Sequence, residues 1–199
     1  MKRYILCLFS IFASCSSYGQ QANHFHSWWV YDGTFQVQEK VSAKVLYAWS
    51  RNDFLMNWQQ SLLRFGLAHQ ARKEIGWGGG YEWIERFPYG EQPLPEQITI
   101  HRFYQRLTVK NKIGQVGLTQ TLRFNQEQNN NRFRYFIIHQ IGVKIPIRLS
   151  EERSIFLILS EGIFINHGEW ANKNYFGQNR VFAGFKIPLN PAIAVDFGY

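Results

Sequence analysis

The chain has 199 residues, enough for one domain, and a formal net charge of +8. Charged residues make up 18% and aromatic residues 17%, and a soluble domain usually carries about 25% charged residues. The two cysteines, Cys7 and Cys15, lie near the amino terminus, so the rest of the chain excludes disulfide and thiol chemistry.

The first segment has the pattern of a secretory signal peptide. Basic residues precede an apolar run over 4–13, and the small residues Ser17 and Gly19 fit a cleavage site before Gln20. Ten apolar residues are too few to span a bilayer. Cleavage removes two cations and lowers the net charge from +8 to +6. Lipoprotein processing at Cys15 is the alternative.

Period-two alternation dominates the rest of the chain, and no stretch has the 3.6-residue period of an amphipathic helix. In 132–143, for example, Arg134 and Gln140 alternate with Phe133 and Ile137, and alternate residues of a strand face opposite sides. The pattern predicts about ten strands, with Asp32-Gly33 and 127–131 as connections and a turn over 146–153. In chain order, the predicted strands are 24–31, 34–50, 57–70, 74–86, 98–110, 114–125, 132–143, 154–166, 175–187 and 192–199.

Many of these strands are unusually long, near thirteen residues. At about 3.3 Å per residue and a tilt near 45°, about thirteen residues cover roughly 30 Å. That height matches the hydrocarbon core of a bilayer.

The choice of polar residue favours a membrane barrel over a soluble β protein. Mid-strand cations are almost all arginine, whose planar fork suits enclosed hydrogen-bond networks. Lysines sit mainly at strand ends, and tryptophans gather near strand ends as in interfacial girdles. The sequence therefore predicts an all-β fold, an antiparallel up-and-down transmembrane-type β-barrel with an arginine-rich interior. A soluble periplasmic barrel that binds a ligand in its lumen is the alternative.

The inward polar residues form the candidate site. We expect Glu161 to neutralise one or two of the arginines, because unpaired buried arginines are costly. The network either fills a narrow barrel as a structural element or offers a lumen to a small anionic solute. Its predicted members are Arg64, Glu82, Arg102, Arg106, Arg123, Arg134, Gln140, Glu161, Gln178 and Arg180.

Other chemistry has weaker support. His24 and His26 share a strand face but have no third metal ligand nearby, so no metal or cofactor is expected. His101, His139 and Ser160 would be the residues of a lipid-hydrolysing site, yet their spacing does not indicate a nucleophile beside a base. Arginines spread evenly over the strands of a secreted chain argue against nucleic-acid binding.

The sequence resembles the DUF2490 family, whose members are secreted proteins of unknown function, common in Bacteroidetes-type bacteria and grouped with outer-membrane β-barrels. The resemblance covers nearly the whole mature chain. It implies a bacterial outer-membrane barrel, of up to twelve strands in the full family. The motifs that carry it are Arg64 with Gly66-Leu67, Gly79-Gly80-Tyr81, His101-Arg102, Leu122-Arg123-Phe124, Arg132-Phe133-Arg134-Tyr135, Ser160-Glu161 with Asn166, Gln178-Asn179-Arg180 and Phe197-Gly198-Tyr199.

We therefore expect a signal peptide at 1–19 and a single barrel domain at 20–199. Members of the family continue past this Gly-Tyr, and the predicted last strand ends on the side of the long loops. Both features suggest a missing closing strand, although an uncounted N-terminal strand would also restore the parity. The expected role is non-catalytic: an outer-membrane barrel, structural or passing a small solute, with membrane lipid as its surroundings. A membrane-embedded lipid-modifying enzyme is the alternative.

Overall fold

A computed structural model describes residues 26–52, 57–87, 96–129, 132–150, 153–167 and 175–199. Each strand is hydrogen-bonded antiparallel to the next in chain order, from β1 to β10. The strands are β1 (His26–Gln38), β2 (Val41–Asn52), β3 (Asn57–Gln70), β4 (Ile75–Arg86), β5 (Ile98–Ile113), β6 (Val116–Asn129), β7 (Arg132–Arg148), β8 (Ser154–His167), β9 (Phe176–Pro188) and β10 (Ala194–Gly198).

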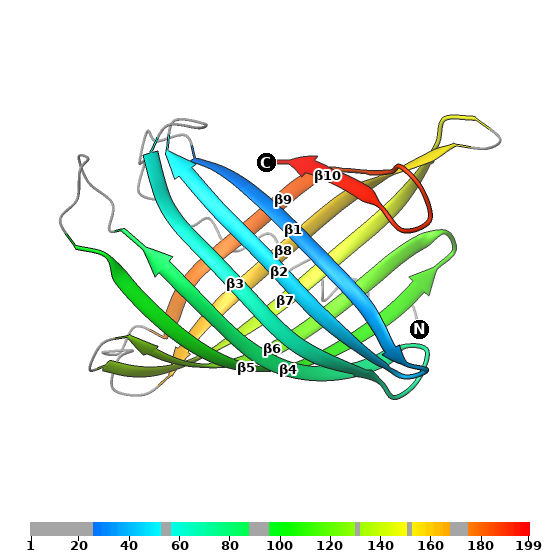
Figure 1. Ribbon diagram of the computed structural model, residues 1–199. Coiled ribbons are helices and arrows are strands. Elements are labelled where there is room, and N and C mark those ends of the chain that lie inside the picture. Colours follow the sequence, from blue (N-terminus) through cyan, green and yellow to red (C-terminus); the bar gives the residue numbers. More distant parts are fainter. Residues whose placement is uncertain (1–25, 53–56, 88–95, 130–131, 151–152, 168–174) are drawn as a thin grey trace.

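The prediction of an all-β, up-and-down fold of ten strands is confirmed. The sheet curls strongly and forms half of a barrel, with β1 and β10 as its two edges in the described residues (Figure 1). The strands from β1 to β9 have twelve to seventeen residues. Among the described residues there is no helix of the length and hydropathy needed to cross a bilayer.

Three predicted connections belong to strands instead. Asp32-Gly33 lies inside β1, which turns later, at Glu39-Lys40. Pro146 lies inside β7 opposite Phe156, so the following turn begins after Arg148. The third error matters most. Glu127 belongs to β6, which continues to Asn129. We predicted a loop there because the residues of this run are polar. Alternate members of the run face polar side chains of the neighbouring strands, and this allows a polar run to form a strand.

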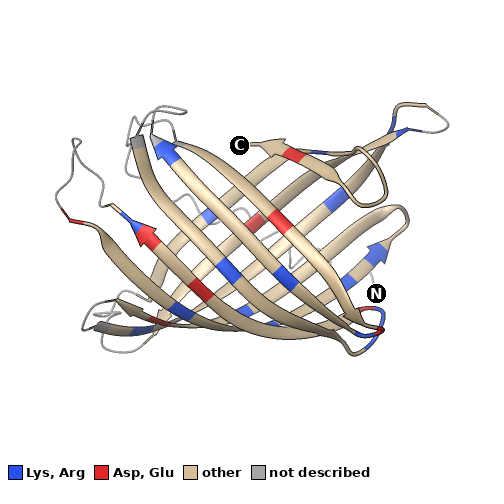
Figure 2. Cartoon of the chain, viewed as in Figure 1, with Lys and Arg blue, Asp and Glu red and all other residues tan. Residues whose placement is uncertain are grey.

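The strand register divides the charges between the two faces of the sheet. We call the side of Arg64, Glu82 and Arg102 the charged face, and the other side the apolar face. By register, all lysine and arginine side chains described within strands, except Arg51, lie on the charged face. Figure 2 marks the positions of the charged residues along the strands. These residues are Lys44, Arg64, Arg86, Arg102, Arg106, Lys110, Lys112, Arg123, Arg134, Lys144, Arg148, Arg180 and Lys186.

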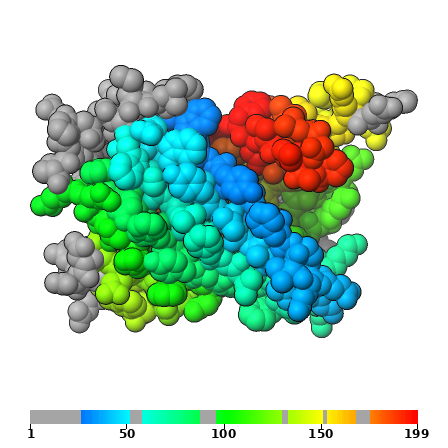
Figure 3. Space-filling model, viewed as in Figure 1, coloured from blue at the N-terminus to red at the C-terminus, as the bar shows by residue number. Residues whose placement is uncertain are grey.

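The apolar face exposes large hydrophobic side chains. Leu67 is 60% exposed, Phe103 58% and Val181 69%. In the space-filling view, the atoms of β1 to β4 lie side by side on the side that faces the viewer (Figure 3). A face of this kind is unusual in a soluble monomer, which rarely exposes a large contiguous apolar surface.

Four buried aliphatic residues form a cross-strand row on the charged face. Ala48, Leu62, Ile84 and Ile100 are paired in register from β2 to β5 and are nearly fully buried. The next row along the strands holds the main ionic residues. The packed core therefore lies directly beside the charged network.

Glycines on β3 and β4 allow close approach of neighbouring atoms. A Cβ on Gly80 would lie 2.0 Å from the Phe65 carbonyl oxygen, and one on Gly66 would lie 2.3 Å from the Tyr104 hydroxyl. Backbone from the neighbouring strand thus approaches Gly80, and the Tyr104 side chain covers Gly66. Such close approach is a recognised role for glycine within strands.

A buried ion-pair network as the candidate functional site

Five charged residues of alternating sign occupy one row across the charged face. Their backbone positions are paired directly in register, so each charge faces one of opposite sign on the next strand. Opposite charges at such positions stabilise the strand pairs. In strand order from β3 to β7, the residues are Arg64, Glu82, Arg102, Glu127 and Arg134.

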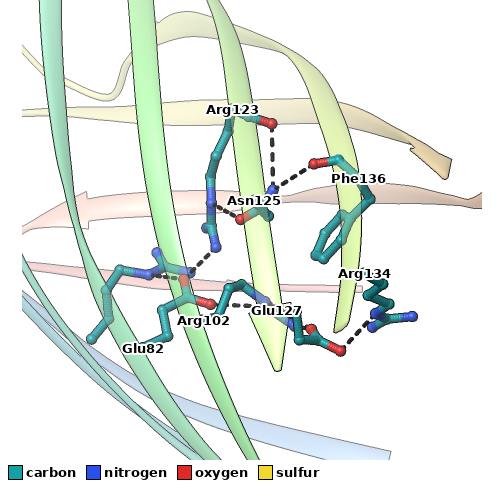
Figure 4. A network of polar contacts seen from close by, with 8 residues as sticks. Glu82, Arg102, Arg123, Asn125, Glu127, Arg134 and Phe136 are labelled. Atoms are coloured by element: carbon teal, nitrogen blue, oxygen red, sulfur yellow. Dashed lines mark hydrogen bonds and ion pairs between the residues drawn. The ribbon is translucent and has the colours of Figure 1, made fainter. Parts of the chain in front are cut away.

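Glu82 is the centre of the network. Its side chain has no exposed surface, and its carboxylate contacts three arginines. Arg64 Nε lies 2.5 Å from Oε1, and Arg102 Nη1 lies 2.6 Å from Oε2. Arg123 Nη2 donates to Oε1 as well (Figure 4). Three guanidinium groups thus replace the water that this carboxylate loses on burial.

Glu127 forms the second anionic centre and is 3% exposed. Arg102 donates to its Oε2 through Nη2 and through Nε, the latter at 2.9 Å. Arg134 Nε lies 2.6 Å from Oε1 as an ion pair. Arg102 therefore bridges the two carboxylates and joins the two halves of the network (Figure 4).

Asn125 fixes the position of Arg123. Its Oδ1 accepts a hydrogen bond of 2.7 Å from Arg123 Nε, and its Nδ2 donates to the carbonyl of Arg123 at 3.3 Å and to that of Phe136 at 3.4 Å. The asparagine is fully buried. Both polar groups of the side chain are therefore satisfied, as burial requires.

Two aromatic rings cover the guanidinium groups. Arg123 and Arg64 lie 4.6 Å and 5.7 Å from the centre of the Tyr104 ring. Arg102 and Arg134 each lie 5.1 Å from the centre of the Phe136 ring. Cation–π contacts of this kind become stronger when they are desolvated. Each of the four arginines thus has a carboxylate partner and an aromatic face.

Some contacts on the charged face reach across an intervening strand. Arg123 of β6 reaches Glu82 of β4 across β5, and Arg64 of β3 reaches the Tyr104 ring on β5 across β4. Contacts of this reach are expected on the concave side of a curled sheet, and we infer that the charged face is that side. The ring contacts on the apolar face, such as Trp29 with Trp49 and Phe124 with Tyr135, join neighbouring strands.

Other predicted site residues lie on the same face but outside the network. Arg106 is paired in register with Arg123, so two like charges face each other. Gln140 is exposed. Arg180 lies 4.9 Å from the centre of the Phe164 ring, and the Gln178 amide lies beside its guanidinium. Gln178 and Arg180 thus form a separate group on β9.

The predicted role of Glu161 is wrong. It lies on the apolar face, paired in register with Ile141 and Val181, and its Oε1 accepts a hydrogen bond of 2.9 Å from Asn179. Being on the opposite face, it cannot be the counter-charge of the arginines. Glu127 has that role beside Glu82.

The sequence prediction also missed Asn125, Tyr104 and Phe136. If the alternation of β6 is continued past Asn125, Glu127 falls on the same face as Asn125 and Arg123, because it lies two positions after Asn125 and four after Arg123. The aromatic residues carried no such signal. Tyr104 and Phe136 sit on a polar face, where only the arginines of neighbouring strands explain them.

The residues of the alternative enzyme site do not meet. His101 and His139 lie on the apolar face, whereas Ser160 lies on the charged face. His101 Nδ1 is instead 2.5 Å from the Tyr81 hydroxyl. His24 and the side chain of His26, considered as metal ligands, lie outside the described residues. In the part of the chain that is described, no group of three or more potential metal ligands occurs.

Comparison with curated proteins and with solved structures found no match. One family model matches residues 25–199, which include all ten strands and the whole ion-pair network. That family is described as a protein family of unknown function. The chain therefore belongs to the DUF2490 family.

Proposed function

We propose that this protein is a non-catalytic β-barrel of the bacterial outer membrane, whose cation-rich concave face holds or passes small anionic solutes. One observation carries the proposal: the separation of charge between the two faces of the sheet. Arg51 is the only lysine or arginine described within a strand that lies on the apolar face. Of the carboxylates described within strands, Glu85 and Glu161 share that face.

The separation matches the demands of a bilayer. An arginine or lysine side chain facing lipid at mid-membrane destabilises a barrel by about 2–4 kcal/mol, and a carboxylate does so by less. Exposed leucine, phenylalanine and valine side chains are stabilised by the same hydrocarbon. Strands of twelve to seventeen residues from β1 to β9 are also long enough to cross it at a tilt.

Within the concave face, we assign a structural role to the network of Glu82 and Glu127. All its guanidinium groups have aromatic and carboxylate partners, so little of their charge is left for a solute. The cations outside this network have fewer acidic partners. Lys44 lies within electrostatic reach of Arg106 and Lys110, and Asp32 is the one nearby acid among the described groups that act on it.

Arg106 is the best candidate for a solute contact. It faces Arg123 across the strand pair, and no described carboxylate forms a salt bridge with it. A free cation beside a like charge attracts anions. Because like charges directly opposite destabilise a strand pair, replacing Arg106 should not weaken the fold.

Fractionation and ion selectivity test the proposal. We expect the protein in the outer-membrane fraction, and recovery in a soluble periplasmic extract would contradict the location.

In planar bilayers, the reversal potential in a salt gradient should indicate anion preference, and Arg106→Gln should reduce that preference. The matched control, Arg72→Gln, removes a cation from an exposed turn and should leave it unchanged. If the reversal potential shows no anion preference, or Arg106→Gln does not change it, the solute role is wrong even if the location is right.

A further inference from the structure

Arg51 is the exception to the separation of charge. It is paired in register with Trp58 on the apolar face, near the ends of β2 and β3. A guanidinium on a lipid-facing surface is costly at mid-membrane but costs only about 0–1 kcal/mol near the interface. An outward arginine at the end of a strand pair therefore indicates the level of the lipid headgroups.

Arg51 is one of the residues that line a shallow hollow of about 380 Å³. The hollow is open to the surface, and all its lining residues lie on the apolar face by register. An arginine, two indoles and a phenol line it, which is the composition of an aromatic interfacial belt with one cation added. The lining residues are Tyr47, Trp49, Arg51, Trp58 and Ser61.

The walls of the hollow are held in place. Trp58 Nε1 donates to Ser61 Oγ at 2.9 Å, and the Trp58 ring packs edge-on against Phe87 with 5.1 Å between ring centres. On the other side, Trp49 stacks on Trp29 at 6.3 Å between centres. The indole walls are therefore positioned without a ligand.

A β-bulge aims Trp58 outward. The register shifts between Ser50 and Arg51, and Gln59 is the extra residue on β3. Gln59 is 3% exposed; its Oε1 accepts from Ser50 Oγ at 3.0 Å and its Nε2 donates to the Phe87 carbonyl at 3.2 Å. Bulges are common where a strand re-aims a functional side chain.

The charge of Arg51 has no described counter-ion. None of the salt bridges among the described residues includes it. Glu85, on the same face, accepts hydrogen bonds of 3.0 Å from Thr99 at both oxygens and another from Gln97. The Glu85 carboxylate is thus hydrogen-bonded to residues of β5 and the segment before it.

We infer that this hollow binds the phosphate group of an anionic membrane lipid, an inference that rests on the proposed membrane location. The guanidinium matches phosphate with two parallel hydrogen bonds. The indole and phenol walls contact the less polar part of the headgroup. At the membrane interface, lipid phosphate groups have a high local concentration. Free phosphate has no apolar part that the aromatic walls could contact.

Native mass spectrometry of the detergent-solubilised protein tests the site. We expect phosphatidic acid to bind more tightly than phosphatidylcholine. Arg51→Gln should weaken phosphatidic acid binding about tenfold, the effect of losing a charge-assisted pair. Arg51→Lys loses the planar fork but keeps the charge, so it should weaken binding less than Arg51→Gln does. Arg72→Gln, at an exposed turn, is the matched control and should not change it.

Three results would overturn the inference: equal binding of both lipids, unchanged binding in both Arg51 variants, or full displacement by millimolar inorganic phosphate. Insertion into vesicles, measured on the same samples by protease protection, separates the two proposals. An inserted protein whose Arg51 variants bind lipid normally contradicts the lipid site alone. A protein that does not insert contradicts the proposed function.

Discussion

Arg123 of β6 forms an ion pair with Glu82 of β4 across the intervening strand β5. The pair links strands that share no backbone hydrogen bonds, so it restrains the curvature of the sheet rather than the pairing of two neighbours. Arg64 reaches the same carboxylate oxygen from the other side. Glu82 thus gathers β3, β5 and β6 around β4.

Glu82→Gln should strongly destabilise the folded protein. The change removes the charge that three arginines share and leaves them facing one another in a buried site, which typically costs about 3–5 kcal/mol. The free energy of unfolding in guanidinium chloride, measured in lipid vesicles, checks this. Glu161→Gln is the matched control, because it makes the same change on the apolar face and its amide oxygen can still accept from Asn179. We expect an effect of about 1 kcal/mol or less there.

The pairing of Glu82 with Arg123 should appear as a coupling energy. In a double-mutant cycle of Glu82→Gln and Arg123→Gln, the double mutant should be more stable than the sum of the single effects predicts, by about 1–3 kcal/mol. Simple additivity would mean that the two side chains do not meet, and that the charged face is not concave at this point.

Gly80→Ala should destabilise the sheet. The added Cβ would lie 2.0 Å from a backbone carbonyl oxygen of β3, which cannot yield without moving the strand, and forced overpacking costs about 1–3 kcal/mol. Gly142→Ala provides the comparison, since the nearest atom to its Cβ would be 3.9 Å away. The same unfolding measurement should show little change for Gly142→Ala, and equal effects of both variants would rule out the close approach as the cause.

Tyr104→Leu should weaken the network although it removes no charge. The ring covers two guanidinium groups, and its loss should cost about 1–2 kcal/mol beyond the change in apolar burial. Phe103→Leu, at the next position on the apolar face, controls for the change in side-chain type. An effect of Tyr104→Leu no larger than that of Phe103→Leu would show that the cation–π contacts contribute nothing.

The fold class and most of the network could be predicted from the sequence because they depend on alternation. Period-two patterning gives the strands, and it places Arg64, Glu82 and Arg102 on one face. The position of the turn between β1 and β2 was predicted wrongly because Asp32-Gly33 is a common turn pair. The same pair can lie within a strand when its backbone is hydrogen-bonded to a neighbouring strand, as it is to β2 here.

The partners within the network could not be predicted, because cross-strand register is a three-dimensional quantity. Glu161 was chosen as a counter-charge because it is an acidic residue in the middle of an apolar strand. Its face depends on the register of that strand, and a shift of one residue moves a side chain to the opposite face. Glu127 was overlooked because the polar residues around it resemble a loop. The hollow at Arg51 depends on a bulge, for which the sequence carries no clear signal.

The central claim is that the apolar face meets hydrocarbon while the charged face does not. Single cysteines at Leu67 and Val181 on the apolar face, and at Thr108 on the charged face, can carry a fluorophore once Cys7 and Cys15 are absent or replaced. In vesicles containing brominated lipid, we predict strong quenching of the labels at Leu67 and Val181 and little at Thr108. Strong quenching at Thr108, or none at Leu67 and Val181, would contradict the account.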